Sequence, residues 1–403
     1  MNQSFDVVII GGGQVGAALA AALNDAPISI ALIEAQMPEM ADTSPQTLDN
    51  CDLRVSALNL ASENFLRHLG AWQNLPIQRL SPYSAMRVWD GEGTGHIQFH
   101  ADELAESHLG HIVENRLTNQ ALMDGLRQQS NVQLLMPVKV EKLEQLNSGG
   151  YCIELDNGQS LYTQLVVAAD GARSFVREWA QFETREWDYG HHALVCAIEV
   201  ERSHEQCAWQ RFTEDGVLAF LPLAQSNLCS IVWSCPEEKA QQLLALNETE
   251  FLNELTRSFE TKLGQVKACS KRVAIPLRQR HGKRYVKDGV VLVGDAAHSI
   301  HPLAGQGVNL GFMDAYVLAD EIKQGLKRGL SAHHPEVLAR FERRRMPENL
   351  TMMATMEGFK RLFAVKTPAL RWLRNWGMSK MNRLDFVKNH IVQQAMGSQR
   401  RIR

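Results

Sequence analysis

Three glycines near the start of the chain have the spacing of a phosphate-binding turn. Gly11, Gly13 and Gly16 follow the apolar run "DVVII" and precede the small-residue stretch "AALAAAL". The first glycine permits a tight turn, the second lets the backbone approach a pyrophosphate, and the third lets the next helix pack closely on the strand. The phosphates would lie at the helix N-terminus, where free N–H groups and the helix dipole favour anions. This stretch predicts a dinucleotide site, to which we also assign Gln14 and Val15.

An acid stands at the distance that such a site requires. Glu34 ends a second apolar run, "ISIALIE", 23 residues after Gly11. A carboxylate there can accept hydrogen bonds from an adenosine ribose, and it disfavours the 2′-phosphate of NADP. FAD and NAD therefore stay open as the bound dinucleotide. No second glycine motif of this kind occurs, so another dinucleotide would bind without a domain of its own.

A long turn late in the chain, "GDAAHSIHPLAGQGVNLG" at 294–311, is the second candidate site. It follows the apolar run "GVVLV" and exceeds the roughly two to six residues of an ordinary strand-to-helix loop. Apolar residues then recur at helical spacing from 308 to 326, which predicts a helix whose first N–H groups are exposed. That helix N-terminus comprises Gly305, Gln306, Gly307 and Val308.

The same turn has the groups that the other half of an FAD needs. Asp295 would accept hydrogen bonds from the ribityl hydroxyls. The helix end would face the pyrimidine edge of the flavin, where the reduced ring carries negative charge. Pro302 would hold a fixed backbone near the reactive face. We interpret His298 and His301 as structural residues rather than proton carriers.

Three further polar residues have roles that their types alone leave open. Arg54 lies just before an amphipathic helix that is expected to end near Gly70. Arg116 lies in the first turn of another expected helix, as either a cofactor contact or a surface arginine. Asp170, in "AADGARSFVR", ends an apolar strand and by itself is a turn-forming acid.

Composition and charge limit the class of protein. The chain has 403 residues, of which 45% are hydrophobic and 22% charged, as in ordinary globular proteins. Its seven cysteines have no C-x-x-C spacing, so we expect no disulfide framework, no metal site and a cytoplasmic location. Neither a signal peptide nor a membrane-spanning run is recognisable. Residues 340–403 carry a net charge of +11 against −14 in residues 1–339, which suggests an anionic surface or partner, or only a solvated helical face.

The order of elements predicts an α/β fold with an inserted second domain. A Rossmann-like dinucleotide-binding domain is expected from residues 1–80, 103–178 and 285–345. Between 189 and 280 the hydrophobic pattern changes to period two, with one helix at 247–263, which predicts a mostly antiparallel sheet. A substrate domain is therefore assigned to 81–102 and 179–284, and a basic helical region to 346–403. Phe220, Pro222 and Trp233 are assigned to a pocket on this sheet, with the core as the alternative.

These motifs together resemble a known family. "GGGQVG", "ADGARSFVR" and "GDAAHSIHPLAGQGVNLG" occur in this order in the group A flavoprotein aromatic hydroxylases, which have the p-hydroxybenzoate hydroxylase fold. "LRVSALN", "SHLGHIVEN", "WDYGHHALV", "LAFLPL" and "LCSIVWS" are similar to the ubiquinone-biosynthesis hydroxylases within that group. The likeness is greatest to the bacterial 2-polyprenylphenol hydroxylases that modify ring position C5.

The resemblance implies an activity and residue roles. NAD(P)H would reduce a tightly bound FAD, O2 would add to the flavin, and the resulting C4a-hydroperoxide would hydroxylate a phenol ring. The cofactor-contacting residues that it implies are Glu34, Arg54, Arg116, Asp170, Asp295 and the stretch from Gly305 to Asn309. No catalytic acid or base can be assigned, and Arg54 and Pro302 are the candidates near the reactive face.

The resemblance also implies partners and leaves alternatives. The substrate would be a polyprenylphenol-type lipid, with other ubiquinone-biosynthesis subunits as protein partners and no nucleic acid. The C-terminal stretch "MEGFKRLFAVKTPALRWLRNWGMSKM" mixes aromatic and basic residues, which suits peripheral contact with an anionic membrane. Another ring position or another phenol remains open. A non-enzymatic FAD-binding scaffold in the same pathway is the remaining alternative.

Overall fold

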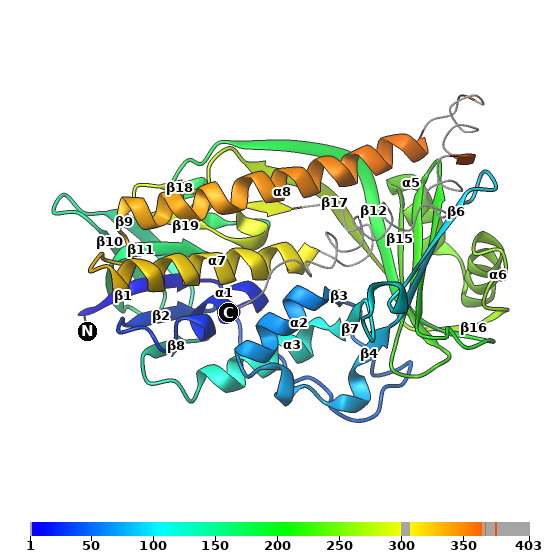
Figure 1. Cartoon of the computed structure of the whole chain (residues 1–403), viewed down its shortest axis with the longest axis horizontal. Coiled ribbons are helices and arrows are strands. Elements are labelled where there is room, and N and C mark those ends of the chain that lie inside the picture. The colour runs from blue at the N-terminus through cyan, green and yellow to red at the C-terminus, as the bar shows by residue number, and fades with distance from the viewer. Residues whose placement is uncertain (1, 300–306, 365–366, 368–374, 377–403) are drawn as a thin grey trace.

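Two large sheets and a small one organise the chain (Figure 1). The structure is a computed structural model, and it describes residues 2–299, 307–364, 367 and 375–376. The mixed α/β architecture predicted from the sequence is confirmed, including its two kinds of sheet.

The first sheet has a parallel core. Its strand order is β18-β19-β11-β1-β2-β8, and β10 and β9 extend it beside β11. All the pairs from β19 to β8 are parallel, so their carboxyl ends meet at one edge of the sheet. Apolar runs without alternation form these central strands because both faces are covered. The strands are β1 (Asn2–Ile10), β2 (Ile30–Ile33), β8 (Val132–Leu135), β9 (Val140–Gln145), β10 (Tyr151–Leu155), β11 (Ser160–Ala168), β18 (Val286–Lys287) and β19 (Val290–Leu292).

Helices pack around this sheet. Helix α1 (Gln14–Ala22) contacts both α3 (Asn115–Leu126) and α7 (Gly307–Lys327). Its residues from Gly16 to Ala22 are all buried, and their small side chains let the neighbouring elements approach closely. The helix predicted from the apolar spacing after residue 307 is confirmed as α7.

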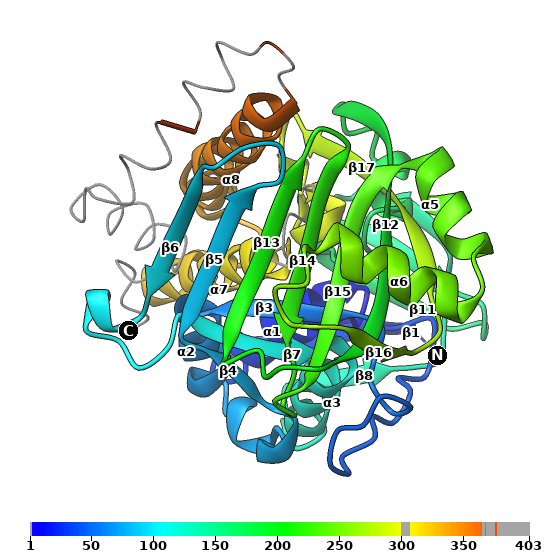
Figure 2. The ribbon, with the colours of Figure 1, turned by 90° about the vertical axis from the view of Figure 1, so that its right-hand side faces the viewer.

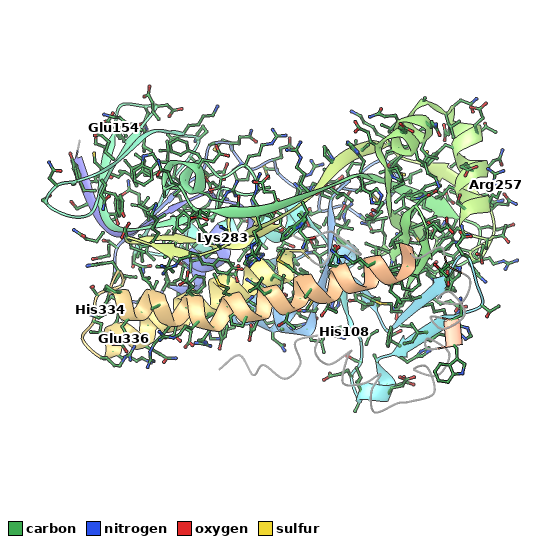
Figure 3. The ribbon with its side chains drawn as sticks, turned by 90° about the horizontal axis from the view of Figure 1, so that it is seen from above. His108, Glu154, Arg257, Lys283, His334 and Glu336 are labelled. Carbon is green, nitrogen blue, oxygen red and sulfur yellow. The ribbon has the colours of Figure 1, made fainter. Side chains whose placement is uncertain are left out.

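Helix α8 (Pro335–Ala364) packs along α7 and links the two large sheets. Figure 3 labels His334 and Glu336 at its start and Arg257 at the opposite end of the molecule. Near the helix end, Phe363 packs on Phe212 of the second sheet, with ring centroids 4.3 Å apart. The predicted boundary at 345/346 therefore falls inside a continuous helix.

The second sheet is antiparallel except between β13 and β5. Its order is β20-β17-β12-β15-β14-β13-β5-β6, with β16 beside β12. Helices α5 (Glu237–Ala245) and α6 (Glu248–Ser258) cover one face, as Figure 2 shows. The sequence predicted only the second of these helices. The strands are β5 (Ala85–Asp90), β6 (His96–His100), β12 (Thr184–Val200), β13 (Cys207–Thr213), β14 (Gly216–Pro222), β15 (Leu228–Pro236), β16 (Val266–Cys269), β17 (Val273–Gly282) and β20 (His298–Ser299).

A small third sheet lies against the other face of the second sheet. It joins β3 (Val55–Asn59), β7 (Gly110–Glu114) and β4 (Ser81–Tyr83). Asn59 caps α2 (Leu60–His68) by accepting a hydrogen bond from the Ser62 N–H, at 3.0 Å. The remaining short helices are η1 (Trp72–Asn74), η2 (Ile77–Arg79), η3 (Asp102–Leu104), α4 (Phe175–Trp179) and η4 (Gly294–Ala296).

The strands of the two large sheets come from separate predicted domain segments, apart from β20, which pairs with β17 of the second sheet. The small sheet combines β3 and β7 of the predicted dinucleotide-binding segments with β4 of the predicted substrate segments. The chain thus returns to the second sheet immediately after the acid-containing turn at 294–297. The division into domains stays a prediction, but this crossing shows where the two sheets are tied together.

Candidate functional site

The predicted motifs lie side by side at one edge of the parallel sheet. β1 leads into Gly11, β11 into Asp170 and β19 into Gly294, and these three strands are neighbours. The Ala169 N–H donates to Ile10 O at 2.8 Å, and the Val293 N–H donates to Ala168 O at 3.0 Å. Ligands of open α/β sheets bind at this carboxyl edge.

The three glycines of the first motif have different tasks. Gly11 has φ of +108°, and a Cβ atom there would lie 2.4 Å from Ala169 O. A Cβ atom on Gly16 would lie 2.0 Å from Gly11 O. These two glycines are required by the protein itself. A Cβ atom on Gly13 would meet nothing within 4 Å, so the N-terminus of α1 opens onto free space that a pyrophosphate can enter.

The acid after β2 is held in place by backbone N–H groups. Glu34 Oε2 accepts from the Gly12 N–H at 2.7 Å, and Oε1 accepts from the Gln36 N–H at 2.9 Å. Each carboxylate oxygen retains a further lone pair, which a ribose hydroxyl can use.

The two residues between the second and third glycines contact protein. The Gln14 side chain donates to Asn115 O at 3.4 Å. Val15 fills the space beside two glycines, since a Cβ atom on Gly311 would lie 2.5 Å from it and one on Gly294 3.1 Å. Val15 thereby packs the first motif against the third.

Asp170 offers an acceptor that the described protein does not use. Its Oδ2 accepts from the Val176 N–H at 3.2 Å. Its Oδ1 is buried and has no hydrogen-bond partner among the described residues. Burial raises the pKa of this carboxyl. Because a buried acceptor without a partner is rare in native proteins, this atom is a place for a ligand hydroxyl.

A buried arginine that we did not predict joins the segment "DGARSFVR" after β11 to the turn at 294–297. Arg177 donates from Nη1 to Ala296 O at 3.0 Å and from Nη2 to Ala172 O at 2.9 Å. Its position in "DGARSFVR" was visible in the sequence, but its partners were not, because they depend on the adjacency of β11 and β19.

Asp295 is accessible to solvent although protein surrounds it. These surroundings raise the pKa of its carboxyl, and the positive charges of His298 and Arg54 oppose the increase. The structure therefore brings Arg54 near Asp295. Arg116 is directed elsewhere, with Nη1 2.7 Å from Glu39 Oε2. A cofactor contact by Arg116 stays a prediction that its present ion pair does not favour.

The first turn of α7 is fixed to the small sheet. Asn309 donates from Nδ2 to Ala57 O at 2.8 Å, and its Oδ1 accepts from the Asn59 N–H at 3.1 Å. The side chain is thus occupied, and what this turn offers a ligand is its main-chain N–H groups, including those of Gly307 and Val308. Pro302, Gly305, Gln306 and His301 lie outside the described residues.

A buried ion pair that includes Asp314 of α7 stabilises the turn at 294–297. His298 Nε2 lies 2.5 Å from Asp314 Oδ2, in agreement with a structural role for this histidine. Asp314 also accepts from the Gly294 N–H at 3.0 Å and from Arg345 Nε at 2.7 Å. Burial alone raises the pKa of Asp314, but His298 and Arg345 outweigh it and hold the pKa below its usual range.

The predicted aromatic pocket residues face the wrong side of the second sheet. Phe220 is fully buried and stacks on Phe259 at the end of α6, with ring centroids 3.5 Å apart. Lys239 of α5 lies 5.6 Å from the centre of the Trp233 ring. Pro222 shares the face of Phe220 because strand residues alternate. These residues belong to the core beneath α5 and α6, which corrects the pocket assignment.

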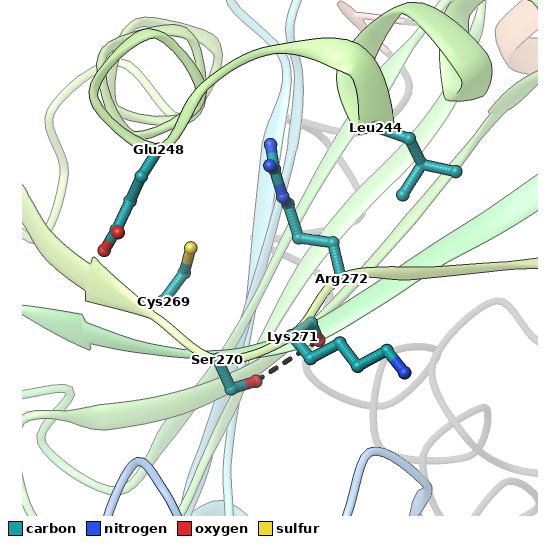
Figure 4. Close-up of a pocket in the computed structure, with 6 residues that line it drawn as sticks. All are labelled: Leu244, Glu248, Cys269, Ser270, Lys271 and Arg272. Atoms are coloured by element: carbon teal, nitrogen blue, oxygen red, sulfur yellow. Dashed lines mark hydrogen bonds between the residues drawn. The ribbon is translucent and has the colours of Figure 1, made fainter.

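A depression of about 350 Å³ lies on that same helix-covered side (Figure 4). Within it, Arg272 donates to Leu243 O at 3.0 Å and to Leu246 O at 2.8 Å, which ties β17 to the end of α5. The depression is separated from the motif loops by the sheet. It is lined by Leu244, Glu248, Cys269, Ser270, Lys271 and Arg272.

One group among the described residues has metal-ligating side chains, although the sequence led us to expect no metal. Glu63 Oε2 lies 2.8 Å from His108 Nε2 and 2.9 Å from His111 Nδ1. Arg67 contacts Oε1 of the same carboxylate at 2.7 Å. Burial opposes ionisation of Glu63, but these hydrogen bonds outweigh it and hold its pKa low. Hydrogen bonds to the two histidines and Arg67 therefore account for this cluster.

Comparison with known proteins identifies the family. Residues 4–353 match the family described as "FAD binding domain". The chain belongs to this family. It is 36% identical to "3-demethoxyubiquinol 3-hydroxylase" of Escherichia coli (strain K12), covering 98% of this chain and 99% of that protein. It is also 36% identical to "Ubiquinone hydroxylase UbiL" of Rhodospirillum rubrum, covering 98% and 90%.

Solved structures share the fold. The p-nitrophenol 4-monooxygenase PnpA from Pseudomonas putida DLL-E4 has a TM-score of 0.78 at 20% identity, covering 98% of this chain and 99% of that one. PqsL from Pseudomonas aeruginosa, a probable FAD-dependent monooxygenase, has a TM-score of 0.76 at 20% identity, covering 94% and 100%. The resemblance to the group A flavoprotein hydroxylases is confirmed. The chain is an FAD-dependent monooxygenase that uses NAD(P)H and O2.

The residues at the sheet edge fit FAD. Gly13 leaves space at a helix N-terminus, Asp170 keeps an unused buried acceptor, and Asp295 exposes a carboxylate. Anionic phosphates suit the helix end, and sugar or ribityl hydroxyls suit the carboxylates.

Replacement of Asp295 by alanine is expected to weaken FAD binding. A hydrogen bond to a charged group contributes about 1.5–3 kcal/mol, so the loss corresponds to roughly 10- to 100-fold in affinity. The fold should be retained because this side chain is solvent-accessible. FAD content after purification and a fluorescence titration measure the effect. Asp215→Ala, on an exposed turn, is the control, and an Asp295→Ala protein that stays fully yellow refutes the ribityl role.

Proposed function

We propose that the enzyme hydroxylates the ring of a polyprenylphenol intermediate of ubiquinone biosynthesis, at position C5. The observation that carries the proposal is the nearly full-length match to two curated ubiquinone hydroxylases. Position C5 rests on the likeness of the sequence to the bacterial 2-polyprenylphenol hydroxylases, and hydroxylases of the other ring positions share the motifs that carry this likeness. The Escherichia coli relative is named for a different hydroxylation, so another ring position is the alternative that the experiment must separate.

The protein's own contribution to this reaction is binding and orientation. When bound, FAD supplies the redox chemistry that couples NAD(P)H oxidation to O2 activation. The N-terminus of α1 at Gly13 would hold the pyrophosphate, Glu34 the adenosine ribose, and Asp295 the ribityl chain. The first turn of α7 would direct its N–H groups and helix dipole at the edge of the flavin where negative charge develops. The acid or base that serves the phenol stays unassigned.

A lipid substrate raises the question of membrane contact. None of the helices in the described part of the chain is long and apolar enough to cross a bilayer. Contact with an anionic membrane surface or with other subunits through residues 346–403 remains part of the proposal. The net positive charge of this end supports it.

Complementation tests the reaction and its position together. A bacterium deleted for its C5 hydroxylase is given this gene, and its quinone intermediates are profiled by mass spectrometry. We expect ubiquinone to return and the polyprenylphenol derivative that lacks the C5 hydroxyl to disappear. A Gly13→Asp variant, which should not hold FAD, is the matched negative control.

Persistence of the intermediate beside FAD-loaded protein would contradict position C5. The same gene in strains that lack the other ring hydroxylases then distinguishes another position from another phenol. An assay of oxygen-dependent NAD(P)H consumption with the purified protein tests the scaffold alternative. A scaffold without enzymatic activity would show no such consumption when a prenylphenol is added.

A further inference from the structure

Gln210 places an amide in an otherwise apolar row of the second sheet. It pairs with Ala219 on β14 and with Val88 on β5. The row continues through Val232 on β15 to Val195 on β12. Side chains of residues paired across strands lie on the same face, so the neighbours of this amide in the row are alanine and valine.

The face on which Gln210 lies is opposite α5 and α6, and we call it the inner face. Its neighbours in β13 point the other way: Trp209 packs near Phe259, with ring centroids 6.4 Å apart, and Arg211 Nη1 donates to Ser258 O at 2.5 Å. Because strand residues alternate, Gln210 points toward the small sheet and the cofactor edge.

Gln210 is 6% exposed as a whole residue, and no described residue hydrogen-bonds to its amide. Its amide atoms are not among the fully buried unpaired ones, so they stay within reach of water or of a ligand. Gln210 can both donate and accept hydrogen bonds. On an apolar face, such a group can form a hydrogen bond with a polar atom of a ligand.

Elements on both sides of Gln210 delimit this position. Two residues earlier, Ala208 shares a buried cluster with Ala57 of β3. Two residues later, Phe212 packs on Phe363 of α8. The amide therefore lies between β3 and the end of α8. Asn309 at the start of α7 hydrogen-bonds to Ala57 O, so this position adjoins the element that holds the flavin end of the cofactor site.

We propose that Gln210 binds an oxygen substituent of the substrate ring and so determines which ring carbon faces the flavin. This inference rests on the proposed function and names a residue for its specificity. The valines and alanine of the row suit the flat apolar ring, and the amide suits its hydroxyl, carbonyl or methoxy oxygen. A phenol oxygen would supply the partner that the amide lacks.

The test compares two probes on the FAD-loaded enzyme. One is a phenol with a two-isoprene chain at the ortho position, and the other is the same prenylated ring without oxygen. Binding is followed by the change in flavin absorbance, with Gln210→Met as the variant. Gln164→Met, the same exchange at an exposed position of β11, is the control. We expect Gln210→Met to bind the phenol about tenfold more weakly and the oxygen-free ring as the wild type does.

Two results would overturn the inference. One is equal phenol binding by Gln210→Met and wild type. The other is an equal loss for both probes, which would indicate packing instead of a hydrogen bond. Gln210→Leu, which also removes the amide without adding a charge, provides the same comparison if Gln210→Met does not fold. If the wild type binds the phenol without hydroxylating it, the proposed function fails while the ratio of the two probes still decides the role of Gln210.

Discussion

A Gly13→Asp variant should fold like the wild type and fail to retain FAD. Gly13 is the N-cap of α1 and makes no side-chain cap, whereas aspartate is a favoured N-cap residue. Its backbone is extended, with φ of −67°, and a Cβ atom there meets no other atom within 4 Å. The free enzyme should therefore be unchanged or slightly stabilised. A carboxylate about 4 Å from a phosphate at an effective dielectric constant near 20 costs about 4 kcal/mol, or roughly a thousandfold in affinity.

Two measurements separate binding from folding in this variant. Thermal unfolding of the FAD-free protein should give the wild-type midpoint or a higher one, while flavin fluorescence titration should show the loss of affinity. Gly16→Ala is the instructive contrast, because its Cβ atom would collide with Gly11 O and should lower stability with or without FAD. A Gly13→Asp protein that purifies with a full complement of FAD would place the pyrophosphate elsewhere.

The cofactor edge could be predicted because its signals are local in sequence. Gly11, Gly13 and Gly16 lie within a single turn, and Glu34 ends the next strand at the expected distance. The apolar spacing after residue 307 predicted α7. The adjacency of the three motifs then followed from the order of parallel strands, which few topologies permit.

The inner and outer faces of the second sheet could not be distinguished from the sequence. Period-two alternation shows that successive residues of its strands point to opposite faces of the sheet. It does not show which of the two faces meets α5 and α6. Helix α5 was not predicted, so the sequence did not show that a helix covers the face on which Phe220 and Trp233 lie. Gln210, between Trp209 and Arg211, is visible as a binding residue only after the covered face is known.

Contacts between buried charged residues that are far apart in the sequence could not be predicted from the sequence pattern either. Asp314 stands in the apolar stretch "LGFMDAYVLA", where an acid is unusual, and this was an available signal. Its partner Arg345 is on the next long helix and looks like any arginine of "FERRRM". Only the packing of α8 on α7 shows which of the three consecutive arginines is buried.

Loss of that arginine should destabilise the protein more than any other replacement considered. Arg345 is buried, donates to Asp314 Oδ1 at 2.7 Å and donates to Asn349 Oδ1 at 2.6 Å. Arg345→Met leaves the buried Asp314 carboxylate without its guanidinium partner, and removal of one member of a buried pair costs about 3–5 kcal/mol. Urea unfolding at neutral pH measures the loss. Arg340→Met, on the same helix with a surface pair to Glu336, should cost about 0–1 kcal/mol.

The pH dependence of this difference identifies its origin. The folded-state pKa of Asp314 lies below its unfolded value, so the pair contributes stability above the unfolded pKa of about 3.9 and loses it as the pH falls toward the folded pKa. The gap between wild type and Arg345→Met should therefore be largest near neutrality and shrink on acidification. Adding Asp314→Leu to Arg345→Met should recover part of the loss, because the unpaired charge is removed. A gap that is independent of pH and persists in the double variant would show that Arg345 stabilises α8 by packing alone.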